Sequence, residues 1–181
     1  MQDERDLVKR AKEGDQKAFA RLYEAHFDRV YRYIVIRIGD KTEAEDMTQQ
    51  VFLNALRSIS SFNWKGTPVA AWLFRIAHNQ VVDYLRKKGK QAVTAYEDAL
   101  ISHDNSLQLA AEHSLDIKQL QMATRRLTPA QQEVITLRFV SELSIAEVAK
   151  VMGKTQGAIK ALQHSAIVAL RKVLAAGNNN E

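Results

Sequence analysis

Toward the C-terminal end, residues 145–164 read IAEVAKVMGKTQGAIKALQH, which has the spacing of a helix-turn-helix. Ala149 is small at the point where the two helices must approach closely. Gly153 stands where the first helix must end in a left-handed turn. The apolar residues expected to fix the second helix against the first are Val148, Met152, Ile159 and Leu162. A second helix held in this way can lie in the major groove of DNA, with its first residues toward the base edges.

Two capping boxes predict where the preceding helices begin. One is Thr128-Pro129-Ala130-Gln131, with proline at the first helical position, and the other is Ser144-Ile145-Ala146-Glu147. Helical hairpins with a glycine turn are common, so the motif alone does not establish DNA binding. The capping boxes and the basic charge of this segment favour it. The exposed candidates for DNA contact are Lys154, Thr155, Gln156, Lys160 and His164.

The first half of the chain also has helical periodicity. From Phe19 to Ile38 apolar residues recur every three or four positions, and Gly39-Asp40 is expected to end that helix. Thr42 with Glu45 predicts a capping box that opens a second helix. Residues 60–67 are expected to form a loop, and Pro68 to open a third helix that runs to about Lys88.

These patterns predict an all-α protein with two small helical domains joined by a flexible linker. The expected boundaries are 1–88 for the first domain, 89–114 for the linker, 115–176 for the second domain and 177–181 for a disordered tail. The linker is expected because residues 89–113 lack a clear period and contain the acidic tract Tyr96-Glu97-Asp98. No alternating run long enough for a strand occurs.

The distribution of charge is more informative than the net value of +5. Residues 1–88 carry 16 Lys and Arg against 12 Asp and Glu, and residues 117–181 carry 9 against 4. Residues 89–116, between them, hold one Lys and five acids. Two basic blocks that flank an acidic hinge suggest two surfaces facing a polyanion, although solvated helix faces would give the same pattern.

Several classes of function are disfavoured by composition. The chain has no cysteine, which removes disulfides and thiolate chemistry and fits a reducing cytoplasm. It shows no signal peptide and no run of 18 apolar residues, so membrane insertion is not expected. The five histidines are scattered and the seven glycines dispersed, so we expect no metal, no cofactor, no catalytic residue and no enzyme activity.

The loop Phe62-Asn63-Trp64 allows two readings from the residues alone. Its aromatic rings could stack on unpaired bases beside a basic helix. Alternatively, Phe62 and Trp64 could tuck beneath the loop as part of the core, which composition favours.

Two blocks of the sequence resemble conserved regions of bacterial sigma factors. The runs AEDMTQQVFLNAL at 44–56 and AWLFRIAHN at 71–79, continued by DYLRK at 83–87, resemble region 2. The segment from Leu127-Thr128-Pro129 to Arg171 resembles region 4. The short spacing between the blocks, with nothing before the first, is similar to the extracytoplasmic-function (ECF) group.

The resemblance implies a sigma factor that binds core RNA polymerase and directs promoter recognition and DNA melting. The partners it implies are the β′ clamp and β flap of the polymerase, promoter DNA and an anti-sigma factor. The core-binding residues it implies are Asp46, Gln49, Gln50, Leu53, Asn54 and Arg57. For the −10 element they are Ser61, Phe62, Asn63, Trp64, Lys65, Trp72, Arg75, Asn79, Asp83 and Arg86. For the −35 element they are Lys154, Thr155, Gln156, Lys160, Ala161, His164 and Arg171.

The sequence departs from the family at two positions and leaves two alternatives open. Trp72 is followed by Leu73 where housekeeping sigma factors have a tryptophan pair, and Ser165 stands where ECF members often have arginine. One alternative is a one-component helix-turn-helix regulator with an N-terminal ligand or dimerisation domain. The other is a helical scaffold whose basic faces are merely solvated.

Overall fold

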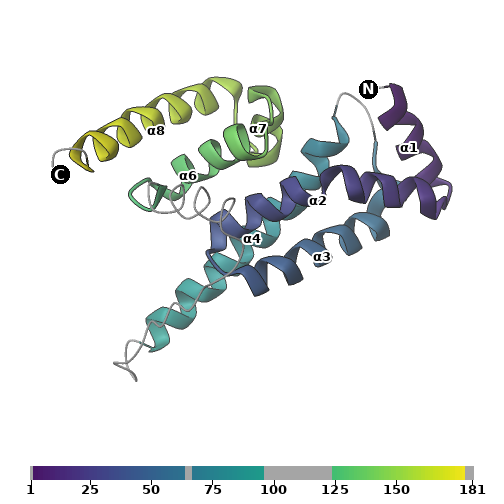
Figure 1. The fold of residues 1–181 in the computed structure, drawn as a ribbon, viewed down its shortest axis with the longest axis horizontal. Helices are drawn as coiled ribbons and strands as arrows, with labels where there is room; N and C mark the ends of the chain where they lie inside the picture. Colours follow the sequence, from purple (N-terminus) through teal and green to yellow (C-terminus); the bar gives the residue numbers. More distant parts are fainter. Residues whose placement is uncertain (1, 64–66, 96–123, 178–181) are drawn as a thin grey trace.

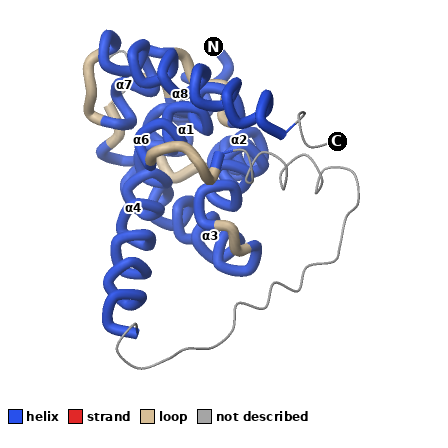
Figure 2. The backbone as a smooth tube through the Cα atoms, turned by 90° about the vertical axis from the view of Figure 1, so that its left-hand side faces the viewer, coloured by secondary structure: helices blue, strands red, loops and turns tan. Residues whose placement is uncertain are grey.

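The computed structural model describes residues 2–63, 67–95 and 124–177 (Figure 1). Within these residues the chain forms helices and connecting loops and no strands, which confirms the all-α prediction (Figure 2). The N-terminal helices gather in one bundle, and the C-terminal helices lie together along one side of it (Figure 1).

Four α-helices and one short turn make up the N-terminal bundle. These are α1 (Gln2–Lys12), α2 (Gln16–Ile38), α3 (Lys41–Ser58), the 3₁₀ turn η1 (Ile59–Ser61) and α4 (Val69–Ala95). The core side chains, including Tyr33, Ile34, Val51, Phe74 and Val81, are completely buried. As predicted, Gly39 ends α2: it has a φ of 79° and donates its N–H to the Val35 carbonyl.

Three expectations for this half need correction. The expected capping box at Thr42 is wrong, because α3 begins at Lys41 and the Asp40 carboxylate accepts the Glu43 N–H at 3.1 Å. Asp40 follows Gly39, the residue that ends α2, and caps as well as threonine does. The third helix does not stop near Lys88, because α4 continues to Ala95, through the first part of the predicted linker. One glycine inside a helix costs only about 1 kcal/mol, and no proline follows Gly89 to break the helix.

The first helix is the third correction, because α1 was not predicted at all. Its residues are mostly charged, so too few apolar residues recur to show helical periodicity. Among residues 3–12, only Leu7, Val8 and Ala11 are buried. The rest of the predicted linker from residue 96, the expected start of the second domain at 115 and the tail from 178 lie outside the described residues.

The C-terminal half contains α6 (Pro129–Ile135), the π-helical turn η2 (Thr136–Val140), α7 (Ile145–Met152) and α8 (Gln156–Gly177). Both predicted capping boxes are confirmed. Thr128 exchanges hydrogen bonds with Gln131, and Ser144 with Glu147. Gly153 ends α7 with a φ of 63°, and Lys154 donates its backbone N–H to Ala149 at 2.9 Å. The predicted helix-turn-helix is therefore formed by α7 and α8.

The two halves pack against each other. In the C-terminal half, α7 lies on α4 and η2 lies on α2. Buried residues of both halves, such as Phe74 and Val148, belong to one continuous apolar cluster. A smaller cluster of Leu127, Ile135 and Ala166 joins α6 to α8.

Candidate polymerase and nucleic-acid interface

The outward face of α3 carries the residues predicted to bind the polymerase. Its inward side chains, among them Val51, Phe52 and Ala55, are buried in the bundle. Asp46, Gln49, Gln50, Leu53 and Arg57 are exposed, and Asn54 is half-buried and accepts a hydrogen bond from Gln50 at 2.9 Å. Leu53 and Leu56 are 47% and 48% exposed on this helix. Two leucines in water beside polar side chains are typical of a protein-binding surface.

A shallow groove joins this face of α3 to α4. Its volume is about 460 Å³. The residues that line it are Asp46, Met47, Gln50, Asn54, Gln80, Asp83, Tyr84 and Lys87. Three residues predicted to bind polymerase (Asp46, Gln50 and Asn54) and one predicted to meet DNA (Asp83) therefore border the same depression.

One stripe of α4 presents the DNA-facing candidates. Arg75, Asn79, Asp83 and Arg86 are exposed and follow each other at intervals of three or four residues, which places them on one helical face. Asp83 and Arg86 form an ion pair at 2.9 Å. Trp72, one turn before Arg75, is half-buried.

The loop before α4 has one aromatic residue in its described part, and that residue is buried. Phe62 is 5% exposed, and its ring centroid lies 4.7 Å from that of Trp72. Phe62 is therefore tucked beneath the loop as part of the core, which is the alternative that composition favoured. Ser61 and Asn63 on either side are exposed, and Trp64 and Lys65 lie outside the described residues.

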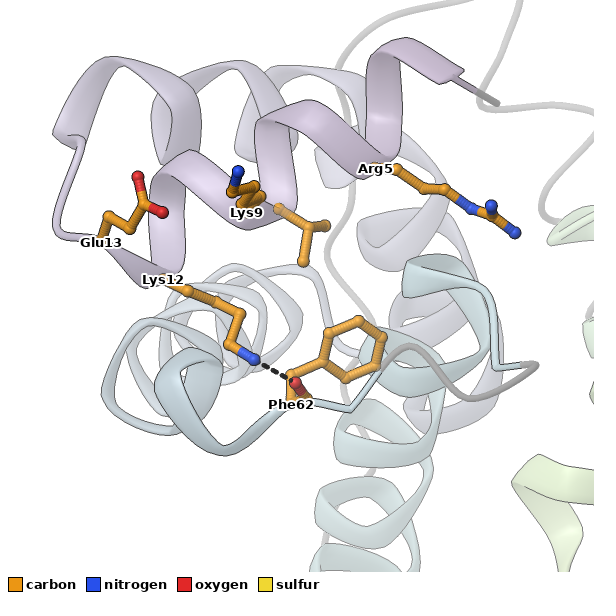
Figure 3. A pocket seen from close by; sticks show the side chains of 6 residues that line it. Arg5, Lys9, Lys12, Glu13 and Phe62 are labelled. Carbon is orange, nitrogen blue, oxygen red and sulfur yellow. Dashed lines mark hydrogen bonds between the residues drawn. The ribbon is translucent and has the colours of Figure 1, made fainter.

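Beside this loop, α1 forms a basic pocket that sequence reasoning missed. It has a volume of about 510 Å³ and an apolar part made by Val8 and Phe62 (Figure 3). Its charged lining residues are Arg5, Lys9, Lys12 and Glu13. Lys12 reaches across to the loop and donates to the Phe62 carbonyl at 2.8 Å (Figure 3). The spacing of residues 5, 9 and 12 on one helical face was the available signal.

The turn and second helix of the helix-turn-helix expose every predicted −35 residue. Lys154, Thr155, Gln156, Lys160, Ala161, His164 and Arg171 are all exposed, whereas Ile159 is buried against the rest of the module. The Thr155 hydroxyl accepts the Ala158 N–H at 3.2 Å, so Thr155 also caps α8. Gln156, Lys160 and His164 lie one turn apart along one face.

Polar contacts with α6 and η2 fix the orientation of α8. The Ser165 hydroxyl accepts a hydrogen bond from Gln131 of α6 at 3.0 Å and donates to the Leu162 carbonyl at 3.1 Å. Arg138 of η2 donates to Gln163 at 3.0 Å. Ser165 therefore connects α8 to α6.

The described residues contain no cluster of three or more histidine or acidic side chains that could hold a metal ion. In the same part of the chain, no helix combines the length and apolar character needed to cross a bilayer.

Comparison with known proteins agrees with this geometry. The sigma-70 region 2 family matches residues 22–91, and the sigma-70 region 4 family matches residues 124–172. ECF RNA polymerase sigma factor SigW of Bacillus subtilis is 30% identical over 182 residues, covering 92% of this chain and 94% of SigW. The chain belongs to the ECF sigma factors. ECF RNA polymerase sigma factor BldN of Streptomyces coelicolor is 43% identical over 171 residues, and the match covers 93% of this chain but 65% of BldN.

Solved structures share the fold of this sigma factor. The sigma factor RpoE of Bartonella quintana, in complex with the anti-sigma factor NepR, matches with a TM-score of 0.75 and 25% identity over 88% of this chain and 98% of RpoE. CnrH, in complex with the cytosolic domain of CnrY, matches with a TM-score of 0.76 and 24% identity over 96% of this chain and 98% of CnrH. The names region 2 and region 4 denote α1 to α4 and α6 to α8, respectively.

Proposed function

We propose that this ECF sigma factor binds core RNA polymerase and directs it to promoters, without catalysing a reaction itself. The observation that carries the proposal is the presence of three exposed surfaces with different chemistry. The α3 face offers apolar and polar contacts to a protein, whereas the α4 stripe and α8 offer cations and amides to DNA. The work of such a protein would take place in the cytoplasm, with the polymerase.

The α3 face is proposed to meet the β′ clamp through Asp46, Gln49, Gln50, Leu53, Asn54 and Arg57. Region 4 is proposed to meet the β flap. An anti-sigma factor is a further proposed partner, since RpoE was solved with one.

The −10 element is proposed to meet the loop and α4. Extracting a base from the duplex costs a few kcal/mol, and stacking on an aromatic ring can return about 1–3 kcal/mol. Phe62 would support the loop from below, because its ring is buried on Trp72. The exposed contacts would come from Ser61, Asn63, Arg75, Asn79, Asp83 and Arg86, with Trp64 and Lys65 proposed from the sequence.

The −35 element is proposed to be read by α8 in the major groove. Gln156 and Lys160 lie in its first turns, where recognition helices contact base edges and phosphates. Lys154, Thr155, Ala161, His164 and Arg171 complete the proposed surface.

Run-off transcription on a pool of genomic promoters tests this function. Core polymerase supplemented with the protein is expected to initiate at a discrete set of new sites. No new initiation, together with tight duplex binding by the protein alone, would instead support a one-component regulator.

Substitution of Leu53 by alanine tests the α3 face. We expect core polymerase to bind the Leu53→Ala variant about three- to tenfold more weakly, because fully burying a leucine side chain contributes about 1.5–3 kcal/mol and Leu53 is 47% exposed. Val82→Ala is the matched control, since Val82 is an exposed apolar residue of α4, 42% exposed, outside the proposed surface. Equal affinities of the two variants, measured by fluorescence anisotropy, would remove Leu53 from the interface.

A further inference from the structure

At the centre of the interface, one buried carboxylate of region 4 is surrounded by polar side chains of region 2. Glu133 of α6 is 3% exposed, and its polar contacts come from the other region. Its Oε1 accepts the Tyr33 hydroxyl at 2.6 Å and lies 2.9 Å from His78 Nδ1, and its Oε2 lies 2.9 Å from Arg37 Nε. Tyr33 and Arg37 belong to α2, and His78 belongs to α4.

The groups around this carboxylate are themselves withdrawn from water. The side chain of Arg37 is 5% exposed, and its second nitrogen donates to the side chain of Gln132 at 2.8 Å. Toward the rim, Arg29 donates to the Ser141 carbonyl, and Lys150 of α7 lies 3.5 Å from the Thr67 hydroxyl. The interface thus has a charged centre within an apolar surround, with polar contacts at its edge.

The ionisation states of Glu133 and Tyr33 are consistent with a charged centre of the interface. Burial raises the pKa of Glu133, but the hydrogen bond from His78 and the charge of Arg37 outweigh it and hold that pKa below the ordinary 4.5. Burial and the charge of Glu133 raise the pKa of the Tyr33 phenol well above 10, so its hydroxyl stays a donor at neutral pH. The carboxylate is therefore ionised in this arrangement, with Oε1 hydrogen-bonded and Oε2 in an ion pair with Arg37.

In this arrangement the two DNA-facing helices, α4 and α8, are too close together to reach both promoter elements. Because α7 packs on α4 and α8 packs on α7, the two DNA-facing helices lie within about two helix diameters, on the order of 20 Å. By their designations, the −35 and −10 elements are about 25 base pairs apart, on the order of 80 Å at about 3.4 Å per pair. Residues 96–123 separate the regions in the sequence, and such a length can reach up to about 90 Å. The chain can therefore span both elements only when region 4 leaves region 2.

We propose that Glu133, with Tyr33, Arg37 and His78, forms a latch that keeps region 4 closed on region 2 and sets how much of the free protein can engage both promoter elements. The consequence for promoters rests on the proposed function, whereas the latch itself does not. In the closed form the α4 stripe and α8 both stay exposed. The latch thus controls the separation of the two reading helices and leaves each able to contact DNA by itself.

The chemistry of the latch favours reversible opening. In the closed form the charge of Glu133 is compensated by Arg37, so removing one partner leaves the other charged, buried and unpaired. In the open form water hydrates both groups. The equilibrium is therefore sensitive to a single charge.

A distance measurement between two labels tests the latch in the full chain. The protein has no cysteine, so cysteines introduced at the exposed positions Asp28 of α2 and Glu142, next to the contact of Arg29 with the Ser141 carbonyl, are the only reactive sites. Single-molecule energy transfer should show mainly the short distance. Glu133→Gln preserves shape and removes the charge, and should raise the ratio of open to closed molecules by about 100-fold or more.

Two further variants make the result specific. Glu24→Gln removes an exposed carboxylate from α2 and should leave the ratio unchanged. Glu133→Gln combined with Arg37→Gln should return part of the closed population, because no unpaired charge is then buried. Far-UV circular dichroism checks that each variant keeps its helices. A ratio in Glu133→Gln equal to that of Glu24→Gln, or a wild-type protein already at the long distance, would overturn the latch.

DNA binding separates the latch from the proposed function. One probe is a fork carrying a −35 duplex and a single-stranded −10 element, taken from the promoter found by run-off transcription, and the other is the −35 duplex alone. Glu133→Gln should bind the fork more tightly by up to the measured gain in open fraction and bind the duplex as the wild type does. An equal gain on both probes would overturn the latch. If the label distance responds but neither probe is bound by any variant, the proposed function fails and the latch stands.

Discussion

Tyr33 takes part in two kinds of packing at once. Its ring stands edge-on to Phe74 at a centroid distance of 5.6 Å, a contact inside region 2. Its hydroxyl donates to Glu133 at 2.6 Å, a contact between regions 2 and 4. The ring contact belongs to a completely buried apolar core, whereas the hydroxyl contact belongs to a charged cluster that water can replace.

The difference between the apolar core of region 2 and the charged centre of the interface indicates which parts of the protein can move. Apolar packing inside region 2 has no alternative partner in water, so it is kept in any folded state of the protein. The polar centre of the interface exchanges one set of hydrogen bonds for another when it opens, at a small net cost. Region 2 is thus expected to stay a rigid unit while region 4 changes position, and substitutions in the core and at the interface test that contrast.

The largest effect is expected from a cavity inside region 2. Phe74 is completely buried, so Phe74→Ala should lower the free energy of unfolding of region 2 by about 3–5 kcal/mol. Urea denaturation followed by circular dichroism measures the loss. The control is Phe139→Ala, because Phe139 of η2 is 55% exposed and its removal should change stability by about 0.5 kcal/mol or less. Similar losses in the two variants would contradict the assignment of Phe74 to the core.

A smaller effect, confined to the interface, is expected from the Tyr33 hydroxyl. Tyr33→Phe keeps the ring against Phe74 and removes one donor to the buried carboxylate. Hydrogen bonds to charged groups contribute about 1.5–3 kcal/mol, so the ratio of open to closed molecules should rise about tenfold or more. The label distance used for the latch measures it.

The control for this prediction is Tyr31→Phe, since Tyr31 is a half-buried residue of the same helix. It should leave the ratio unaltered. The stability of region 2 should also be unaltered in Tyr33→Phe, and a loss as large as that of Phe74→Ala would break the distinction between ring and hydroxyl.

One polar pair inside region 2 should respond to acid, unlike the surrounding core. His26 of α2 is 5% exposed and lies 3.1 Å from Glu4 of α1. Burial lowers the pKa of His26 below its ordinary 6.5, and the charge of Arg29 lowers it further. The hydrogen bond and charge of Glu4 raise it, but they do not offset the effect of burial. The unfolded chain therefore takes up a proton at higher pH than the folded chain does, and stability should fall as pH drops from 6.5 toward the folded-state pKa.

Urea denaturation at pH 7.5 and pH 5.5 checks the direction. The loss at the lower pH should shrink in His26→Gln, which cannot take up that proton. Glu133 does not contribute in this window, because its pKa lies below 4.5. A His26→Gln variant with the full acid sensitivity of the wild type would assign the effect to another group.

The sequence predicted contacts that are local and missed those that are distant. The Ser144–Glu147 box and the turn at Gly153 depend on residues within one helical turn, so their spacing was enough. Glu133 meets Tyr33 across 100 positions of sequence. In the sequence it reads as one more polar residue of a short amphipathic helix, and only the packing of the two regions shows that it is buried.

The predicted site residues follow the same division. The exposed stripes of α3, α4 and α8 could be predicted, because helical periodicity places the polar face opposite the buried one. The basic pocket could be predicted only in part: the spacing of Arg5, Lys9 and Lys12 marks one basic helical face, but α1 reaches the loop at Phe62 only through tertiary packing. Phe62 itself shows the limit: an aromatic residue in a loop has no period, so the sequence left its burial open.

Substitution of Lys160 is expected to leave the interface between regions 2 and 4 unchanged, in contrast to substitution of Tyr33. Lys160 lies on the exposed face of α8 and should reach a DNA phosphate. Lys160→Ala is then expected to reduce the slope of log K against log salt concentration by about 1, because one fewer counterion is released. Lys172→Ala, an exposed lysine further along the same helix, should leave the slope unchanged. Titration of promoter DNA at several salt concentrations measures both.

Since Lys160 makes no contact that closes region 4 on region 2, the open-to-closed ratio must stay at the wild-type value while the slope falls. A variant that changed both would show that DNA contact and closure share residues, and region 4 would then not offer the same DNA-reading face in both states.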